Sequence, residues 1–126
     1  MRFSHSLKVA VEDIDAQNHV NNVAYVKWIQ DVAVAHWLSA TSEETREKLT
    51  WIVTRHEIDY KKPAFENEEI TVTTWVGEPR RVSWERFTEI TRGESLLVKA
   101  RSVWCLIDRE TLKPSRITSK MQDLFD

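Results

Sequence analysis

Glycine, proline and cysteine are scarce in this chain of 126 residues, which holds two glycines, three prolines and one cysteine. So few glycines and prolines exclude flexible linkers, low-complexity tracts and glycine-rich phosphate-binding loops. The single cysteine excludes an internal disulfide and a cysteine-rich metal site. A chain of this length without linkers is expected to form one domain, over residues 1–126.

Long apolar runs and a strong excess of one charge are also missing. No stretch is long and apolar enough to span a bilayer, and the first residues lack the apolar core of a signal peptide. The formal net charge is -2, and no dense stripe of lysine and arginine could follow the phosphates of a nucleic acid. These absences predict a cytoplasmic protein with a small-molecule partner, and neither a membrane nor a nucleic acid as partner.

One long helix is predicted at residues 22–39, which contain neither glycine nor proline. Its apolar residues point in most directions, so other structure should cover most of its sides. A short helix or turn is predicted at 42–48, and a last short helix or arm at 117–125.

A period of two predicts strands in five segments, 5–12, 51–62, 68–78, 81–92 and 95–108. Because the connections between the last four are short, these strands should neighbour one another in chain order. The six tryptophans are spread over the helix and strands, which predicts packing in the core or at an interface. The predicted fold class is α+β, with one long antiparallel sheet of about five strands wrapped around one central, mostly apolar helix.

The chemistry-bearing residues gather before the long helix, in the segment Asp13-Ile-Asp-Ala-Gln-Asn-His-Val-Asn-Asn22. This segment closely resembles the signature of hotdog-fold thioesterases of the 4-hydroxybenzoyl-CoA thioesterase type, and that of plant acyl-carrier-protein thioesterases. Residues 55–75 and 95–117 are similar to later strands of these families, so the resemblance covers nearly the whole chain. It implies the hotdog fold and hydrolysis of acyl-CoA or acyl-carrier-protein thioesters, without a cofactor. It also implies a homodimer or a dimer of dimers.

Thioester hydrolysis needs a carboxylate that attacks or deprotonates water, and donors for the developing oxyanion. Asp15 is the candidate carboxylate, as general base or as nucleophile. The backbone N–H near Asn22, at the start of the helix, is the donor that the resemblance implies. His19 is a third catalytic candidate because a histidine titrates near neutral pH and could shuttle a proton.

Gln17, Asn21 and Tyr25 are the expected substrate contacts. Plainer interpretations stay open, because the side chains of Asn21 and Asn22 also suit helix caps. Asp15 likewise suits a simple partner for the helix dipole.

Two departures from the resembling families leave other functions open. Gln17 stands where the plant enzymes carry a catalytic asparagine, and Gln30 stands where several bacterial relatives carry a glutamate that assists water. The alternatives are a hydroxyacyl dehydratase or enoyl hydratase on the same fold, and a non-catalytic binder of acyl groups or small molecules. No metal site is expected, because a calcium loop would need glycine and glutamate where Asn18 and Ala24 stand.

Overall fold

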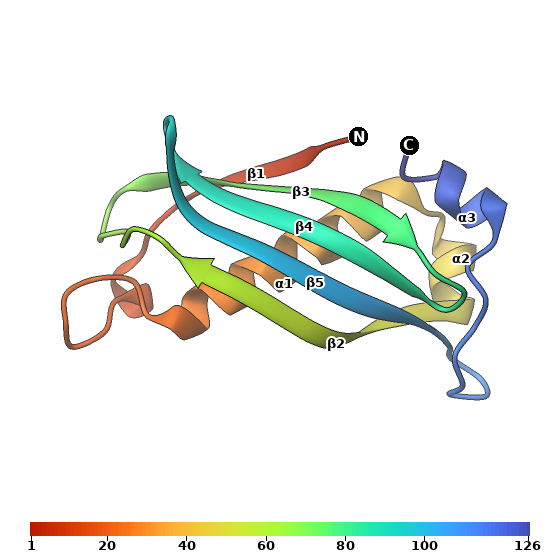
Figure 1. The fold of residues 1–126 in the computed structure, drawn as a ribbon. Coiled ribbons are helices and arrows are strands. Elements are labelled where there is room, and N and C mark those ends of the chain that lie inside the picture. The colour runs from red at the N-terminus through yellow and green to blue at the C-terminus, as the bar shows by residue number, and fades with distance from the viewer.

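The structure, a computed structural model, describes all of residues 1–126 (Figure 1). Its elements in chain order are β1 (Phe3–Lys8), η1 (Val11–Asp13), α1 (Asn22–Ala40), α2 (Glu43–Lys48), β2 (Leu49–Tyr60), β3 (Glu69–Pro79), β4 (Ser83–Arg92), β5 (Ser95–Asp108) and α3 (Ser119–Asp123). All the predicted segments contain the element expected, within a few residues at their ends. The α+β prediction is confirmed.

The five strands form one antiparallel sheet in the order β1-β3-β4-β5-β2. Helix α1 crosses one face of this sheet, behind the strands as Figure 1 draws them. The two edges of the sheet are β1 and β2, and α2 and α3 lie together at one end of the molecule (Figure 1).

The prediction that the strands 51–62 and 68–78 lie next to each other in the sheet is wrong. β2 pairs with β5, whereas β3 lies between β1 and β4. The crossing segment, residues 61–68, connects β2 to β3 past the ends of β5 and β4, a step of about 14 Å at the usual strand spacing. Eight extended residues reach about 26 Å, so the short connection permits this crossing. The N–H groups of Lys61 and Lys62 bind the Leu97 carbonyl as the segment passes β5.

The first strand ends earlier than predicted, at Lys8 instead of residue 12. The Asp13 carboxylate accepts a hydrogen bond from the Ala10 N–H at 3.0 Å, which turns the chain into η1. The strand therefore stops before Glu12 and Asp13, and the following residues are free to form a loop.

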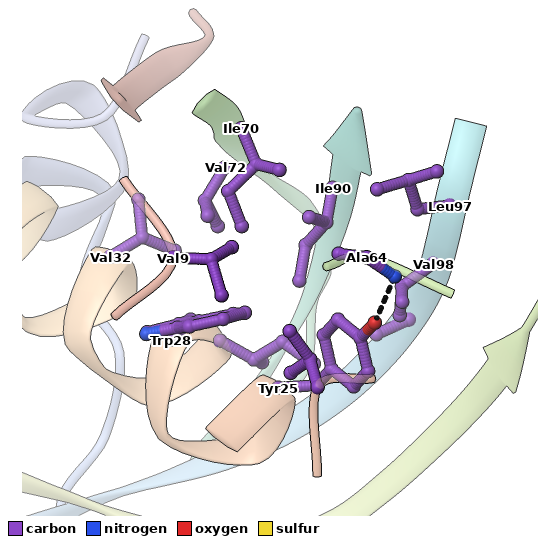
Figure 2. Close-up of a cluster of buried hydrophobic side chains, with 13 residues drawn as sticks. Val9, Tyr25, Trp28, Val32, Ala64, Ile70, Val72, Ile90, Leu97 and Val98 are labelled. Atoms are coloured by element: carbon purple, nitrogen blue, oxygen red, sulfur yellow. Dashed lines mark hydrogen bonds between the residues drawn. The ribbon is translucent and has the colours of Figure 1, made fainter. Parts of the chain in front are cut away.

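The main core lies between α1 and the sheet (Figure 2). Trp28, Ile29 and Val32 of α1 contact the buried aliphatic side chains of the strands there. A second cluster of buried apolar residues lies toward the end of α1. There Phe125 of the C-terminal segment packs with Trp37 of α1 and Trp84 of β4. Residues 117–125 thus form a packed arm that includes the short helix α3.

The expectation that other structure covers most sides of the long helix is wrong for this single chain. One face of α1 packs on the sheet, and apolar residues outside that face are open: Val23, Val34 and Leu38 are 73%, 48% and 53% exposed. A single sheet touches only one side of a helix, so the apolar residues on the other side stay uncovered. None of the helices combines the length and the apolar character that crossing a membrane requires.

Candidate active site

The segment Asp13–Asn22 forms a tight turn closed by its own backbone. The Asp15 N–H donates to the His19 carbonyl at 3.0 Å, and the Asn21 N–H donates to the Asp13 carbonyl at 2.8 Å. Asn18 takes a φ of 68°, in the left-handed region that asparagine tolerates better than most residues. The turn is therefore held in one shape before any ligand arrives.

The Asp15 carboxylate is oriented by this turn and remains in reach of water. Its Oδ1 accepts a hydrogen bond from the Gln17 N–H at 2.9 Å. Its Oδ2 lies 3.7 Å from His19 Nδ1, too far for a hydrogen bond but close enough for an ion pair when the histidine is protonated. About a quarter of the Asp15 side chain, 26%, is exposed. One oxygen is thus fixed and the other can meet a ligand.

The start of α1 offers a free hydrogen-bond donor. Asn21 is the N-cap, because its side-chain oxygen accepts from the Val23 N–H at 2.9 Å, and its carbonyl accepts from the Ala24 N–H. The Asn22 N–H has no acceptor in the turn, and Asn22 is exposed. Unpaired N–H groups at a helix N-terminus carry partial positive charge, so this position favours an anion.

The other candidate residues divide into exposed and buried ones. The Gln17 side chain is exposed and makes no hydrogen bond to the rest of the chain, and the His19 ring is half-buried. Tyr25, in contrast, is buried in the core, and its hydroxyl accepts a hydrogen bond from the Ala64 N–H at 3.0 Å (Figure 2). Burial raises the pKa of this hydroxyl. Tyr25 ties α1 to the crossing segment.

A chain of three polar side chains lies further along α1. Gln30 Nε2 is 3.3 Å from His56 Nε2, and His56 Nδ1 is 2.7 Å from the hydroxyl oxygen of the fully buried Ser102. Burial lowers the pKa of His56. The neutral ring can accept a hydrogen bond from Gln30 and donate one to Ser102. These hydrogen bonds fix the side chain of Gln30. Its partner His56 could not be found from sequence because 26 residues separate the two.

A cavity of about 250 Å³ lies between the C-terminal half of α1 and the sheet. We call it the aromatic cavity, and its principal lining residues are Trp37, Trp51, Trp84, Arg86, Trp104 and Phe125. The tryptophans that were expected to fill the core or an interface thus also form the wall of an open space. Tryptophan spacing along the sequence gave no sign of it, since the residues come from α1, three strands and the C-terminal arm.

Arg86 enters this cavity from β4 as a buried guanidinium. Its Nη1 donates to His36 Nδ1 and to Thr74 Oγ1, each at 3.0 Å, and its side chain is 93% buried. Burial lowers the pKa of Arg86 to about 10. Burial, and then the neighbouring Arg86 charge, lower the pKa of His36 to about 4. At neutral pH His36 is therefore uncharged and accepts a hydrogen bond from a charged arginine.

We expect His36 to make the fold acid-sensitive. Because its pKa is about 4 in the folded chain and about 6.5 ordinarily, the unfolded chain takes up the proton first. The stability due to neutral His36 is fully present above pH 6.5 and is lost as the pH falls toward 4, by on the order of 3 kcal/mol. Urea unfolding of the wild type and His36→Gln between pH 7 and pH 4 measures this. The variant, which retains a neutral acceptor for Arg86, should lose less stability, and equal losses would contradict the prediction.

Known proteins with similar sequences are thioesterases. The sequence profile of the acyl-ACP thioesterase N-terminal domain family matches residues 1–125. A chloroplastic palmitoyl-acyl carrier protein thioesterase from Gossypium hirsutum is 23% identical over an aligned length of 131 residues. The alignment covers 95% of this chain and 32% of that protein. A chloroplastic acyl-[acyl-carrier-protein] hydrolase from Cuphea viscosissima is 29% identical over 85 residues, which cover 65% of this chain and 20% of that protein. The chain therefore spans a third or less of these relatives.

Solved structures give the same fold. A probable thioesterase from Bartonella henselae superposes with a TM-score of 0.80 at 25% identity, over 93% of this chain and 98% of that one. The YbaW probable thioesterase from Escherichia coli has a TM-score of 0.87 at 20% identity, over 97% of this chain and 95% of that one. The expected hotdog fold is thereby confirmed. With a match over 1–125, the chain belongs to the acyl-ACP thioesterase N-terminal domain family.

Proposed function

We propose that the chain hydrolyses acyl thioesters at the turn Asp13–Asn22. One observation carries this proposal: the same rigid turn holds an oriented carboxylate that water can reach, on Asp15, and an unengaged N–H at the start of α1, on Asn22. These are the two groups that the reaction requires. The family and the similarity to the Bartonella henselae structure support the same activity.

In the proposed reaction the thioester carbonyl oxygen points toward the Asn22 N–H. As a general base, Asp15 removes a proton from water while the water oxygen bonds to the carbonyl carbon. The N–H and the helix dipole stabilise the oxyanion, the C–S bond breaks, and the departing thiolate takes up a proton to leave free acid and thiol. As a nucleophile, Asp15 attacks the carbonyl itself, the C–S bond breaks to release the thiolate, which takes up a proton, and water then cleaves the acyl anhydride into free acid and the Asp15 carboxylate.

Three further residues complete the proposed site. His19, whose ring lies beside the Asp15 carboxylate, orients the substrate or delivers a proton to the thiolate. Gln17 and Asn21 border the thioester on the exposed side of the turn. We assign Tyr25 an indirect part, because its buried hydroxyl is already bound to the backbone of Ala64.

Release of thiol from a panel of short, long and aromatic acyl-CoA and acyl-carrier-protein thioesters tests the proposal. We expect release from at least one member, and the comparison of carriers identifies the thiol group that the site accepts. Binding of these thioesters without any release would favour the non-catalytic binder instead. Hydration of enoyl-CoA in the same assays would favour the hydratase.

We further propose that two copies pair through the β2 edge. β2 is 12 residues long, its outer side has no strand partner, and an uncovered edge of this length invites another strand. The open face of α1, with the exposed Val34 and Leu38, lies on the helix side of the same sheet. Two-fold pairing would cover both features at once. A cytoplasmic location stays a prediction.

Light scattering at micromolar concentration measures this pairing directly. We expect a mass of about twice the chain's 14.8 kDa, or about four times if two dimers associate. A mass equal to one chain would rule out the dimer.

A further inference from the structure

The aromatic cavity contains a positive charge that no carboxylate of the chain neutralises. Arg86 forms no ion pair, and its hydrogen-bond partners, His36 and Thr74, are neutral at pH 7. The one acidic residue in the lining, Glu85, is bound to Arg101. A buried guanidinium without an anion is costly, so the arrangement favours a ligand that supplies one.

Trp104, which also lines the cavity, carries a donor without an acceptor. The indole Nε1 of Trp104 is buried without a hydrogen-bond partner, the one such side-chain atom in the structure. Most of the remaining lining is aromatic or aliphatic. An engineered cavity of about 150 Å³ holds benzene, so 250 Å³ accommodates a larger apolar group. The cavity thus suits an apolar body whose far end bears an oxygen acceptor.

We propose that the aromatic cavity receives the far end of the acyl group, and that Arg86 selects acyl groups that end in a carboxylate. This inference rests on the proposed thioester hydrolysis, which it deepens by naming the substrate class. Recognition by a buried charged donor gives strong discrimination, because an uncharged acyl group leaves Arg86 unpaired.

The cavity serves the active site of a second copy. His36, which touches Arg86, lies 14 residues beyond Asn22, about 21 Å along α1. An eight-carbon acyl chain, at about 1.3 Å per C–C bond, covers roughly 10 Å. An acyl group of this size at Asp15 therefore cannot reach Arg86 of the same chain.

Pairing through β2 places the turn of one copy close to the aromatic cavity of the other. The end of β2 lies beside the start of α1, where Tyr60 contacts Tyr25 with ring centroids 5.7 Å apart. The start of β2, at Thr50 and Trp51, lines the aromatic cavity. In an antiparallel pair of β2 edges, the end of one strand lies next to the start of the other. The turn of one copy then faces the cavity of its partner.

Matched substrates test the selection by Arg86. We expect the wild type to have a higher kcat/KM for suberyl-CoA, whose acyl group ends in a carboxylate, than for octanoyl-CoA, whose acyl group ends in a methyl group. In Arg86→Met the ratio of kcat/KM for suberyl-CoA to kcat/KM for octanoyl-CoA should fall by about tenfold to a hundredfold. Lys99→Met, which removes an exposed cation of β5 that does not line the cavity, should leave the ratio unchanged. A wild type that does not prefer suberyl-CoA to octanoyl-CoA overturns the inference without any variant.

A binding measurement separates this inference from the hydrolysis itself. Octanoate and octanamide have the same chain and differ in the charge of the head group, and the tryptophans of the cavity report binding by fluorescence. We expect octanoate to bind the wild type about tenfold or more tightly than octanamide, and this preference to disappear in Arg86→Met. Equal binding of the two to the wild type overturns the inference, even if thioesters are hydrolysed. A preference for octanoate without hydrolysis of any thioester overturns the proposed function and leaves the selection standing.

Mixed dimers test whether the cavity acts across the pair. Asp15→Asn and Arg86→Met are each defective toward the charged thioester, but a dimer of one with the other contains one site with both residues intact if they come from different chains. Random mixing should then restore about a quarter of the wild-type sites. No gain over the separate variants would overturn the arrangement in trans.

Discussion

Replacing Asp15 by asparagine should lower kcat/KM for the best acyl thioester by about a hundredfold or more. The amide has nearly the same shape and can still accept from the Gln17 N–H, so the turn should persist. What it lacks is the basicity and the negative charge needed to deprotonate water or attack the carbonyl. Steady-state kinetics of thiol release measure the loss, and circular dichroism verifies the fold.

Glu12→Gln is the matched control for this prediction. Glu12 is an exposed carboxylate three residues earlier in the chain, and it makes no hydrogen bond or ion pair. Its loss should change kcat/KM little, so an equal loss in both variants would indicate a general effect of charge. Full activity of Asp15→Asn would remove Asp15 from the chemistry. Single turnovers in ¹⁸O-labelled water separate the two roles, since only the nucleophile route puts label into the Asp15 side chain.

Phe125→Ala should destabilise the fold by about 3–5 kcal/mol, the usual cost of truncating a fully buried aromatic ring. Phe125 is 1% exposed, stacks on Trp37 and meets Trp84 edge-on. It also anchors the C-terminal arm, because the five residues of α3 are too few to form a stable helix alone. Since a domain has only about 5–15 kcal/mol of net stability, urea unfolding should show a large shift of the midpoint.

The adjacent Leu124 supplies the comparison for the arm. Its side chain is 40% exposed, so Leu124→Ala should cost far less than Phe125→Ala. Similar costs for the two substitutions would mean that the arm is held by other contacts than the ring of Phe125.

Local features of the chain were predictable from sequence because nearby residues cause them. Helix α1 begins where Asn21 caps it and continues through residues without glycine or proline, and both signals lie within the helix itself. The alternation of β4, in which every second residue from Trp84 to Ile90 is buried, similarly follows from the strand's own period. The turn with Asp15 and His19 was found because its residues are contiguous.

Features that depend on distant residues escaped prediction. The position of β2 beside β5 results from pairing between segments about 50 residues apart, for which the sequence contains no local signal. The same is true of Arg86, which reads as an ordinary charge on a strand until His36 and Thr74 are seen to surround it. The available signal was a charged residue at an inward position of an alternating strand.

The backbone at Ala64 links the turn Asp13–Asn22 to the crossing segment in a way that bears on local unfolding. Its carbonyl accepts from the Val20 N–H at 2.9 Å, and its N–H donates to the Tyr25 hydroxyl, so a peptide group of the turn and a side chain at the start of α1 are bound to the same residue. Neither connection can open without exposing buried backbone to water. The turn and the crossing segment therefore behave as one cooperative unit, in which slow hydrogen exchange at one is coupled to slow exchange at the other.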